Sequence, residues 1–127
     1  LINKHDLTDA VILTKGFIPD DKVVDYFCAA DIVVQPYRTA TQSGVTQVAY
    51  HFNKPMLVTD VGGLKEIVPD GKVGYVVEPN ELAVTEALID FYQNKKAAVF
   101  TRGVREEKKK YSWDKMIKTV TALYTKL

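Results

Sequence analysis

One stretch of this sequence, Pro36–Tyr50, combines residue types that could bind an anion at the start of a helix. Ser43 is a preferred N-cap residue, and apolar side chains recur at helical spacing after it, up to Phe52. Gly44 has no side chain to keep a ligand from the backbone. The free N–H groups of Gly44 and Val45 would therefore point out of the helix together with the positive end of its dipole. An anion fits such a helix start.

Other polar residues near this stretch are candidates of a different kind. Arg38 lies in the loop that should face a bound phosphate, and the sequence is equally consistent with contact to a ligand and with a plain surface role. Lys15 ends an apolar run that should reach the same edge of the sheet. For His51, a packed or surface position is favoured over a role as a base. Glu66 is expected to brace a loop or cap a short helix.

Strands and helices alternate along the chain. Four apolar runs predict buried strands, at Ala10–Thr14, Ile32–Gln35, Pro55–Thr59 and Gly74–Val77. This alternation indicates an α/β fold, a Rossmann-like parallel sheet with helices on both faces, in one domain. Ligands of open α/β sheets bind at the carboxyl ends of the strands, which is where Pro36–Tyr50 begins.

The helices are predicted from capping residues and apolar spacing. Leu1–Leu7 is typical of a helix tail, and Asp20 or Asp21 would cap a helix that carries Cys28 in the core. From Asn80 onward the sequence predicts three helices. Gly103 is expected to be a weak point of the second helix, and Ser112 to cap the third. The aromatic side chains of this last helix, Trp113 and Tyr124, are expected in the core or at an interdomain face.

Composition excludes few classes of protein. The 127 residues are 46% hydrophobic and 26% charged, with a net charge of +1, as in an ordinary soluble domain with one core. A nucleic-acid partner is not indicated, because Lys108–Lys110 follows two glutamates and is typical of a solvated helix face. The single cysteine cannot form an internal disulfide, which predicts a reducing, cytoplasmic compartment. No apolar stretch approaches the roughly 20 residues that span a bilayer, and no signal peptide is visible.

Several segments occur together in an order that resembles the C-terminal domain of retaining glycosyltransferases of the GT-B fold, the group 1 glycosyltransferase family. The resemblance covers nearly all 127 residues and is most specific from Lys54 to Val77. The segments that carry it are Lys15–Ile18, Ala29–Pro36, Gln42–Val45, Asn53–Pro55, Thr59–Val68 and Asp70–Val77.

This resemblance implies a donor domain that binds a nucleotide-diphosphate sugar and transfers its glycosyl group with retention, as a hexosyltransferase. Gly16, Phe17 and Ile18 would lie against the nucleobase. The backbone at Ser43–Val45 would hold the diphosphate, with Arg38 and Gln42 in the same loop. Neither a metal nor a cofactor is expected, because the helix dipole and basic side chains would neutralise the leaving diphosphate. The sequence also lacks the His, Cys or paired-carboxylate spacing typical of a metal site.

The resemblance also implies a longer protein. An N-terminal domain would hold a glycan or lipid-linked acceptor, which leaves open a peripheral contact with the inner face of a membrane. The chain opens in mid-pattern, and the first strands and a basic phosphate clamp of the family would lie before Leu1. Residues 1–127 would then be a partial nucleotide-sugar-binding domain, inactive by itself because catalysis needs donor and acceptor positioned between two domains.

Two glutamates that are usual in the family are absent. Their positions fall on Ala40 and Val48, so the catalytic residues are not assigned. Gln47, next to the second position, would either bond a ribose hydroxyl or lie exposed on the helix. Two alternative functions are compatible with such a fold, a sugar-nucleotide epimerase and a non-catalytic phosphate-binding signalling module. The first needs buried acid and base carboxylates, and the second needs an acidic cluster at the strand ends.

The family's strand order would leave Ala10–Thr14 and Ile32–Gln35 with unpaired edges. Such edges are costly when buried and recruit other chains when exposed. We therefore expect either direct pairing of these two strands or a dimer formed through their edges.

Overall fold

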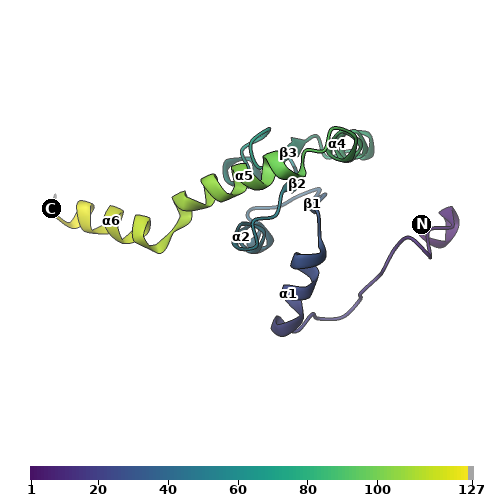
Figure 1. Cartoon of the computed structure of the whole chain (residues 1–127), viewed down its shortest axis with the longest axis horizontal. Coiled ribbons are helices and arrows are strands. Elements are labelled where there is room, and N and C mark those ends of the chain that lie inside the picture. Colours follow the sequence, from purple (N-terminus) through teal and green to yellow (C-terminus); the bar gives the residue numbers. More distant parts are fainter. Residues whose placement is uncertain (126–127) are drawn as a thin grey trace.

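The computed structural model describes residues 1–125 and contains, within them, a parallel sheet of three strands (Figure 1). The strands are β1 (Val33–Gln35), β2 (Met56–Thr59) and β3 (Gly74–Val77), in that order across the sheet. In the register, Leu57 of β2 lies between Val34 and Tyr75. Three of the four expected strands and the parallel sheet are thus confirmed.

Six α-helices and two short 3₁₀ segments accompany the strands in residues 1–125. The N-cap side chains of Ser43, Asn80 and Ser112 each accept a backbone N–H at the start of a helix, as the sequence predicted for Ser43 and Ser112. The three helices expected after Asn80 are also confirmed. The elements are η1 (Asn3–His5), α1 (Asp20–Ala29), α2 (Gly44–His51), α3 (Leu64–Ile67), α4 (Glu81–Gln93), α5 (Ala97–Glu107), η2 (Lys108–Tyr111) and α6 (Trp113–Tyr124).

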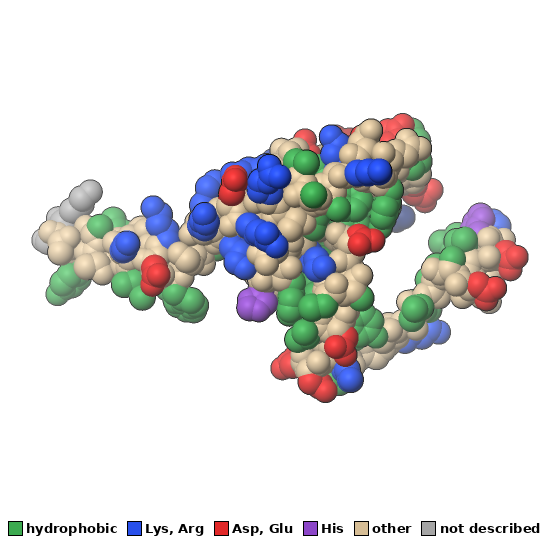
Figure 2. Space-filling view, viewed as in Figure 1, with side chains coloured by type: hydrophobic (Ala, Val, Ile, Leu, Met, Phe, Trp, Pro, Cys, Tyr) green, Lys and Arg blue, Asp and Glu red, His purple; other side chains and the backbone are tan. Residues whose placement is uncertain are grey.

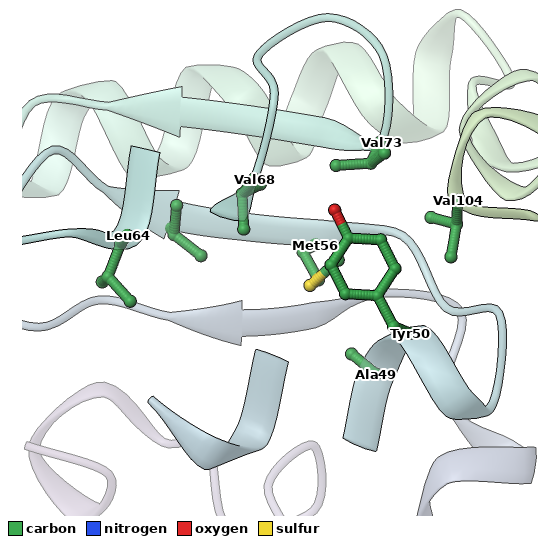
Figure 3. Packing of buried hydrophobic residues seen from close by; sticks show 8 residues of the cluster. Ala49, Tyr50, Met56, Leu64, Val68, Val73 and Val104 are labelled. Carbon is green, nitrogen blue, oxygen red and sulfur yellow. The ribbon is translucent and has the colours of Figure 1, made fainter. Parts of the chain in front are cut away.

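The core surrounds β2, whose four side chains are all buried. Side chains alternate along a strand, so Met56 and Val58 point to one face and Leu57 to the other. On the first face they pack with residues of α2, α3 and α5 and of the turn before β3 (Figure 3). On the second face α4 lies against β2 and β3, and Asp90 of α4 accepts a hydrogen bond from the Tyr75 hydroxyl. Helices therefore cover both faces of the sheet.

Gly103 is a point of close packing in α5, and the prediction that it weakens this helix misses that role. A Cβ atom at this position would lie 1.9 Å from the backbone oxygen of Lys72. The absence of a side chain lets α5 lie directly against the turn that precedes β3. The neighbouring Val104 is fully buried in the core cluster.

The carboxylate of Glu107 connects the end of α5 to the same turn. It is 2% exposed and accepts bonds from Lys110 Nζ at 2.5 Å and Lys72 Nζ at 2.8 Å. The hydrogen bonds from these two ammonium groups hold the pKa of Glu107 below its ordinary value, and the bond from Lys110 has the larger effect. Lys108 donates to the carbonyl of His51 and to Asn53, so it joins η2 to the end of α2. The lysine run is therefore more than a solvated face.

The N-terminal expectations are wrong in the structure. Ala10–Thr14 forms no strand and does not pair with β1; Ile12 is 94% exposed. A strand exists only by pairing, and in the described residues β1 pairs only with β2, so this apolar run has no neighbouring strand; the N–H groups of Ala10 and Val11 bond instead to the carbonyl of Leu7. Of Leu1–Leu7, only Asn3–His5 is helical, as a single 3₁₀ turn. Association of two chains through open edges stays a prediction.

Three further core or capping predictions are wrong. The N-cap of α1 is Pro19 and not Asp20 or Asp21, and Cys28 is exposed. No side chain of α1 is fully buried, although Phe27 stacks on Phe52 at 5.4 Å. In α6, Trp113 and Tyr124 are exposed, so a place in the core is wrong, while the alternative of an interdomain face stays a prediction. Figure 2 shows hydrophobic side chains along one side of this helix.

Replacing Gly103 by alanine tests the close packing of α5. In an open helix this change would stabilise the fold by roughly 1 kcal/mol, because alanine favours helix. Here we expect a loss of about 1–3 kcal/mol in the free energy of unfolding, because the new methyl group meets the Lys72 carbonyl. Urea denaturation measures the change. Gly44→Ala is the matched control, since no atom lies within 4 Å of its Cβ position; a neutral Gly103→Ala would contradict the packing.

Glu107 makes stability depend on pH in one direction. Its pKa is lowered on folding, so its contribution is complete above the unfolded pKa of about 4.3 and is lost as the pH falls through the folded value. Thermal melts between pH 2.5 and 7 should show this loss. Glu107→Gln should cost about 1–3 kcal/mol at pH 7 and flatten the profile. The exposed neighbour provides the control Glu106→Gln, and equal profiles for both variants would contradict the assignment.

Candidate functional site

The carboxyl ends of β1, β2 and β3 lie at one edge of the sheet, because the strands are parallel. Three loops leave this edge and lead into α2, α3 and α4: residues 36–43, 60–63 and 78–80. Open α/β sheets bind their ligands in this position. The stretch singled out by its residue types is the first of these loops together with α2.

Ser43 makes three hydrogen bonds that fix the start of α2. Its hydroxyl donates to Gln35 Oε1 at 2.6 Å and accepts the N–H of Val45 at 3.2 Å. Its carbonyl accepts the hydroxyl of Thr46 at 2.5 Å. The single hydroxyl proton of Ser43 is thus directed into the protein, toward Gln35.

The first residues of α2 are open to solvent. Gly44 and Val45 are exposed, and no atom lies within 4 Å of the place where a Cβ of Gly44 would stand. Gln42 and Gln47 are exposed on either side of them. The helix start therefore presents the Gly44 backbone and the positive end of a helix dipole to any anion in this space. The expectation that the Val45 N–H is free is wrong, because it is bonded to the Ser43 hydroxyl.

The loops after β1 and β2 are held together by backbone contacts. Thr59 donates its hydroxyl to the carbonyl of Tyr37 at 2.6 Å, and the Gly63 N–H bonds to the carbonyl of Thr41 at 3.0 Å. Gly62 adopts φ +55°, and a Cβ there would lie 1.8 Å from the carbonyl oxygen of Ala40. Only glycine accommodates both the conformation and the contact. The position of the loop after β1 therefore depends on the neighbouring loop.

A cleft of about 340 Å³ opens beside these loops, on the side where α4 begins. Arg38 is its cationic residue, and Glu81 at the start of α4 is its acidic one. Its lining residues come from the ends of the strands and from the first turns of α4: Pro36, Arg38, Thr59, Pro79, Asn80, Glu81, Val84 and Thr85.

The acidic residues of this edge are few and partly paired. Asp60, which follows β2, lies 3.1 Å from Lys65 in an exposed ion pair. Asp31 precedes β1 and so lies at the opposite end of that strand. In residues 1–125, no three His, Cys, Asp or Glu side chains are grouped so that they could hold a metal ion.

Comparison with known families identifies the chain. Residues 1–94 match the family model described as glycosyl transferases group 1. The chain belongs to this family. An uncharacterized glycosyltransferase of Methanocaldococcus jannaschii is 31% identical over 111 residues, which are 84% of this chain and 31% of that protein. A subunit of the phosphatidylinositol N-acetylglucosaminyltransferase of Saccharomyces cerevisiae is 26% identical over 131 residues, all of this chain and 28% of the subunit.

A solved structure shows the same fold. Sucrose-phosphate synthase of Thermosynechococcus elongatus superposes with a TM-score of 0.81 at 23% sequence identity, over 98% of this chain and 32% of that enzyme. The group 1 chain therefore has the Rossmann-like architecture of a GT-B glycosyltransferase domain. It spans about a third or less of the length of these proteins.

The structure separates the family-derived site residues into two groups. Arg38 and Gln42–Val45 lie in and after the loop that leaves β1. Gly16, Phe17 and Ile18 precede α1, and Figure 1 places them at the end of α1 that lies away from the sheet. Phe17 is 88% exposed. No hydrogen bond in residues 1–125 joins this segment to the loop after β1.

Three positions near the start of α2 lie outside the cleft: Gln47, Ala40 and Val48. Gln47 lines a shallow hollow with Tyr50, His51 and residues of η2 instead of the cleft that contains Arg38. The two positions that carry glutamate elsewhere in the family are apolar here. Ala40 packs against the core cluster, and Val48 is half-buried on α2.

Sequence reasoning missed the first turns of α4 as a wall of the cleft. Asn80 accepts the Ala83 N–H and starts this helix, and Thr85 lies one turn further on. A signal was present, since Pro79–Asn80 before an apolar helical pattern is typical of a helix start. The sequence contains no sign that this start lies next to Arg38, because that requires β3 to pair beside β2.

Replacing Thr59 by valine tests the contact between the two loops. Valine has the same shape, but it leaves the Tyr37 carbonyl without the hydroxyl at 2.6 Å. We expect a loss of about 1–3 kcal/mol in the free energy of unfolding, because Thr59 is buried. Thr59→Ser keeps the hydroxyl and should retain most of that stability. If chemical denaturation gave both variants the same midpoint, the hydroxyl would not hold the loop.

Proposed function

We propose that this chain binds the nucleotide-diphosphate sugar donor of a group 1 glycosyltransferase. The longer protein would transfer a glycosyl group with retention at the anomeric carbon to a glycan or lipid-linked acceptor. The diphosphate would lie at the start of α2, on the backbone of Ser43, Gly44 and Val45. The nucleobase would lie against Gly16–Ile18 when the complete donor domain is assembled.

The open N-terminus of α2 is the observation that carries this proposal. It combines solvent-exposed residues Gly44 and Val45 at the positive end of the helix dipole with an N-cap whose hydroxyl accepts the Val45 N–H and is fixed from within by Gln35. A diphosphate leaves with negative charge on its oxygens, and fixed dipoles aimed at that charge lower the barrier because they need no reorganisation. Membership of the group 1 family supports the same substrate class.

Arg38 would add a full positive charge from the loop after β1. A guanidinium can bind two oxygens of a phosphate at once, which a neutral donor cannot do. Together the helix start and Arg38 would neutralise the leaving group without a metal or cofactor. Donor binding by these groups uses no carboxylate, which fits the apolar residues at Ala40 and Val48.

Neither alternative function is favoured by an observation. A signalling module would need a cluster of acids at the strand ends, and Asp60 there is paired with Lys65. An epimerase would need buried carboxylates in the cleft, and Glu81, its acidic residue, is exposed. The proposal names no particular sugar or acceptor, because the names of the related enzymes indicate different sugars and different acceptors. None of the helices in residues 1–125 is long and apolar enough to cross a bilayer; a cytoplasmic location, at the inner face of a membrane for a lipid-linked acceptor, is part of the proposal.

Titration of the chain with nucleotide sugars, followed by NMR of its backbone amides, tests the proposal. The signals of Gly44 and Val45 should shift with UDP- or GDP-sugars and not with acetyl phosphate. Gly44→Val should weaken binding about tenfold or more, since its branched side chain would fill the space before the helix while the fold stays intact.

The control for this variant is the unchanged protein at the same concentration. Because the isolated chain is expected to bind weakly, millimolar ligand is needed. Shifts that map elsewhere, with Gly44 unaffected, would place the diphosphate at another site and refute the proposal. A stronger response to acetyl phosphate would favour the signalling module instead.

A further inference from the structure

A buried amide next to the loop after β1 has an unsatisfied donor. Gln35, the last residue of β1, is 3% exposed. Its Oε1 accepts the Ser43 hydroxyl at 2.6 Å, while its Nε2 is buried and has no hydrogen-bond partner in residues 1–125. A buried donor left without a partner destabilises the fold, because it has lost its bonds to water. The amide is therefore held in an arrangement that satisfies only one of its ends.

A half-turn about the last side-chain torsion of Gln35 would exchange these two ends. This torsion is broad and roughly two-fold, and the NH₂ and oxygen ends of the amide are similar in size, so both arrangements fill nearly the same space. Nε2 would then face the Ser43 hydroxyl and donate to it. Because a hydroxyl has two lone pairs, Ser43 could accept from Gln35 and from the Val45 N–H at the same time.

The proton of Ser43 changes direction with the amide. In the observed arrangement it is committed to Gln35 Oε1, and Ser43 offers nothing to an anion. After the half-turn this proton is released from Gln35, and Ser43 could donate it to an anion bound beside Gly44, whose Cβ position is open. A hydroxyl that donates to a phosphate oxygen makes a charge-assisted bond, which is about twice as strong as a neutral one.

We propose that Gln35 is a positioning residue that sets the proton direction of Ser43 and turns its amide when a diphosphate occupies the start of α2. This inference rests on the proposed donor site and adds to it a residue that does not touch the ligand. In the bound state Nε2 gains Ser43 as an acceptor. The amide oxygen loses its donor, so the added bond between Ser43 and the phosphate must offset that loss.

The side-chain amide signals of Gln35 give a direct test in the unmodified chain. In ¹⁵N-labelled protein, titration with inorganic pyrophosphate and with UDP should shift the two Nε2 proton signals of Gln35 in parallel with the backbone signals of Gly44. Gln93, exposed on α4, is an internal control whose side-chain signals should not move. In Ser43→Ala, pyrophosphate should bind several-fold more weakly and leave the Gln35 signals unchanged.

Two substitutions separate this role from a merely structural one. Gln35→Glu, when ionised, can only accept, so it should hold the Ser43 proton and weaken pyrophosphate binding about tenfold. Gln35→Leu releases that proton and should bind within about threefold of the unmodified chain. A structural role predicts the reverse order, because glutamate keeps the bond to Ser43 and leucine does not.

The charge of the introduced glutamate is controlled by adding Ser43→Ala to each background. If Gln35 acts through Ser43, this second change weakens binding in the unmodified chain but not in Gln35→Glu; equal losses in both would indicate charge alone and overturn the inference. Gln35 signals that stay fixed while Gly44 responds would also overturn it and leave the donor site intact. If neither signal responds to either ligand, the donor site itself fails, and the inference fails with it.

Discussion

The burial of β2 between two parallel neighbours is the constraint on which the rest of the structure depends. Its side chains are enclosed on both faces of the sheet, and its backbone bonds to β1 on one side and β3 on the other. Because no water reaches these groups, the N–H and C=O of β2 must be satisfied by both neighbours. Pairing in parallel brings three carboxyl ends to one edge, and the loops of the candidate site start there.

Contacts at this edge of the sheet fix the position of the loop of residues 36–43, although the loop has no regular secondary structure. The loop after β1 is attached to its neighbour by Thr59 and by the close approach of Gly62 to Ala40. Its far end is fixed by the cap at Ser43, which is held in turn by Gln35 from β1. Every one of these contacts comes from within the sheet or from the adjacent loop. The open side of α2 is thus left for a ligand and rests on a rigid support.

The packed centre contrasts with both ends of the chain. Residues 10–18 and α6 carry apolar side chains that stay in solvent, including Ile12 and Trp113. Their patterns are those of buried elements, and on this basis the sequence predicted a strand at Ala10–Thr14 and a last helix packed in the core or at an interdomain face. The strand and the core position are wrong because burial requires a partner surface, and the described residues provide none at these places. Cys28 on α1 is a smaller example, since its helix touches the core mainly through Phe27.

Local chemistry was sufficient to predict β1 to β3, the helices after Asn80, and the caps at Ser43 and Ser112. Each follows from interactions between residues near one another in the chain, such as apolar periodicity or a side chain that bonds the next turn. The family resemblance, carried by short motifs in a fixed order, was likewise visible in the sequence. The proposal of an anion site at the start of α2 likewise needed nothing more than Ser43 and Gly44 beside an apolar helical pattern.

Tertiary structure alone decided the contacts between distant segments. The fit of Gly103 against Lys72, the burial of Glu107 between two lysines, and the cleft between Arg38 and α4 all join residues far apart in the sequence. The local preferences of a glycine or a glutamate are the same whatever segment comes to lie beside it. The pairing of β3 beside β2 determines which segments come together here, because it sets the distance between elements that no local interaction controls.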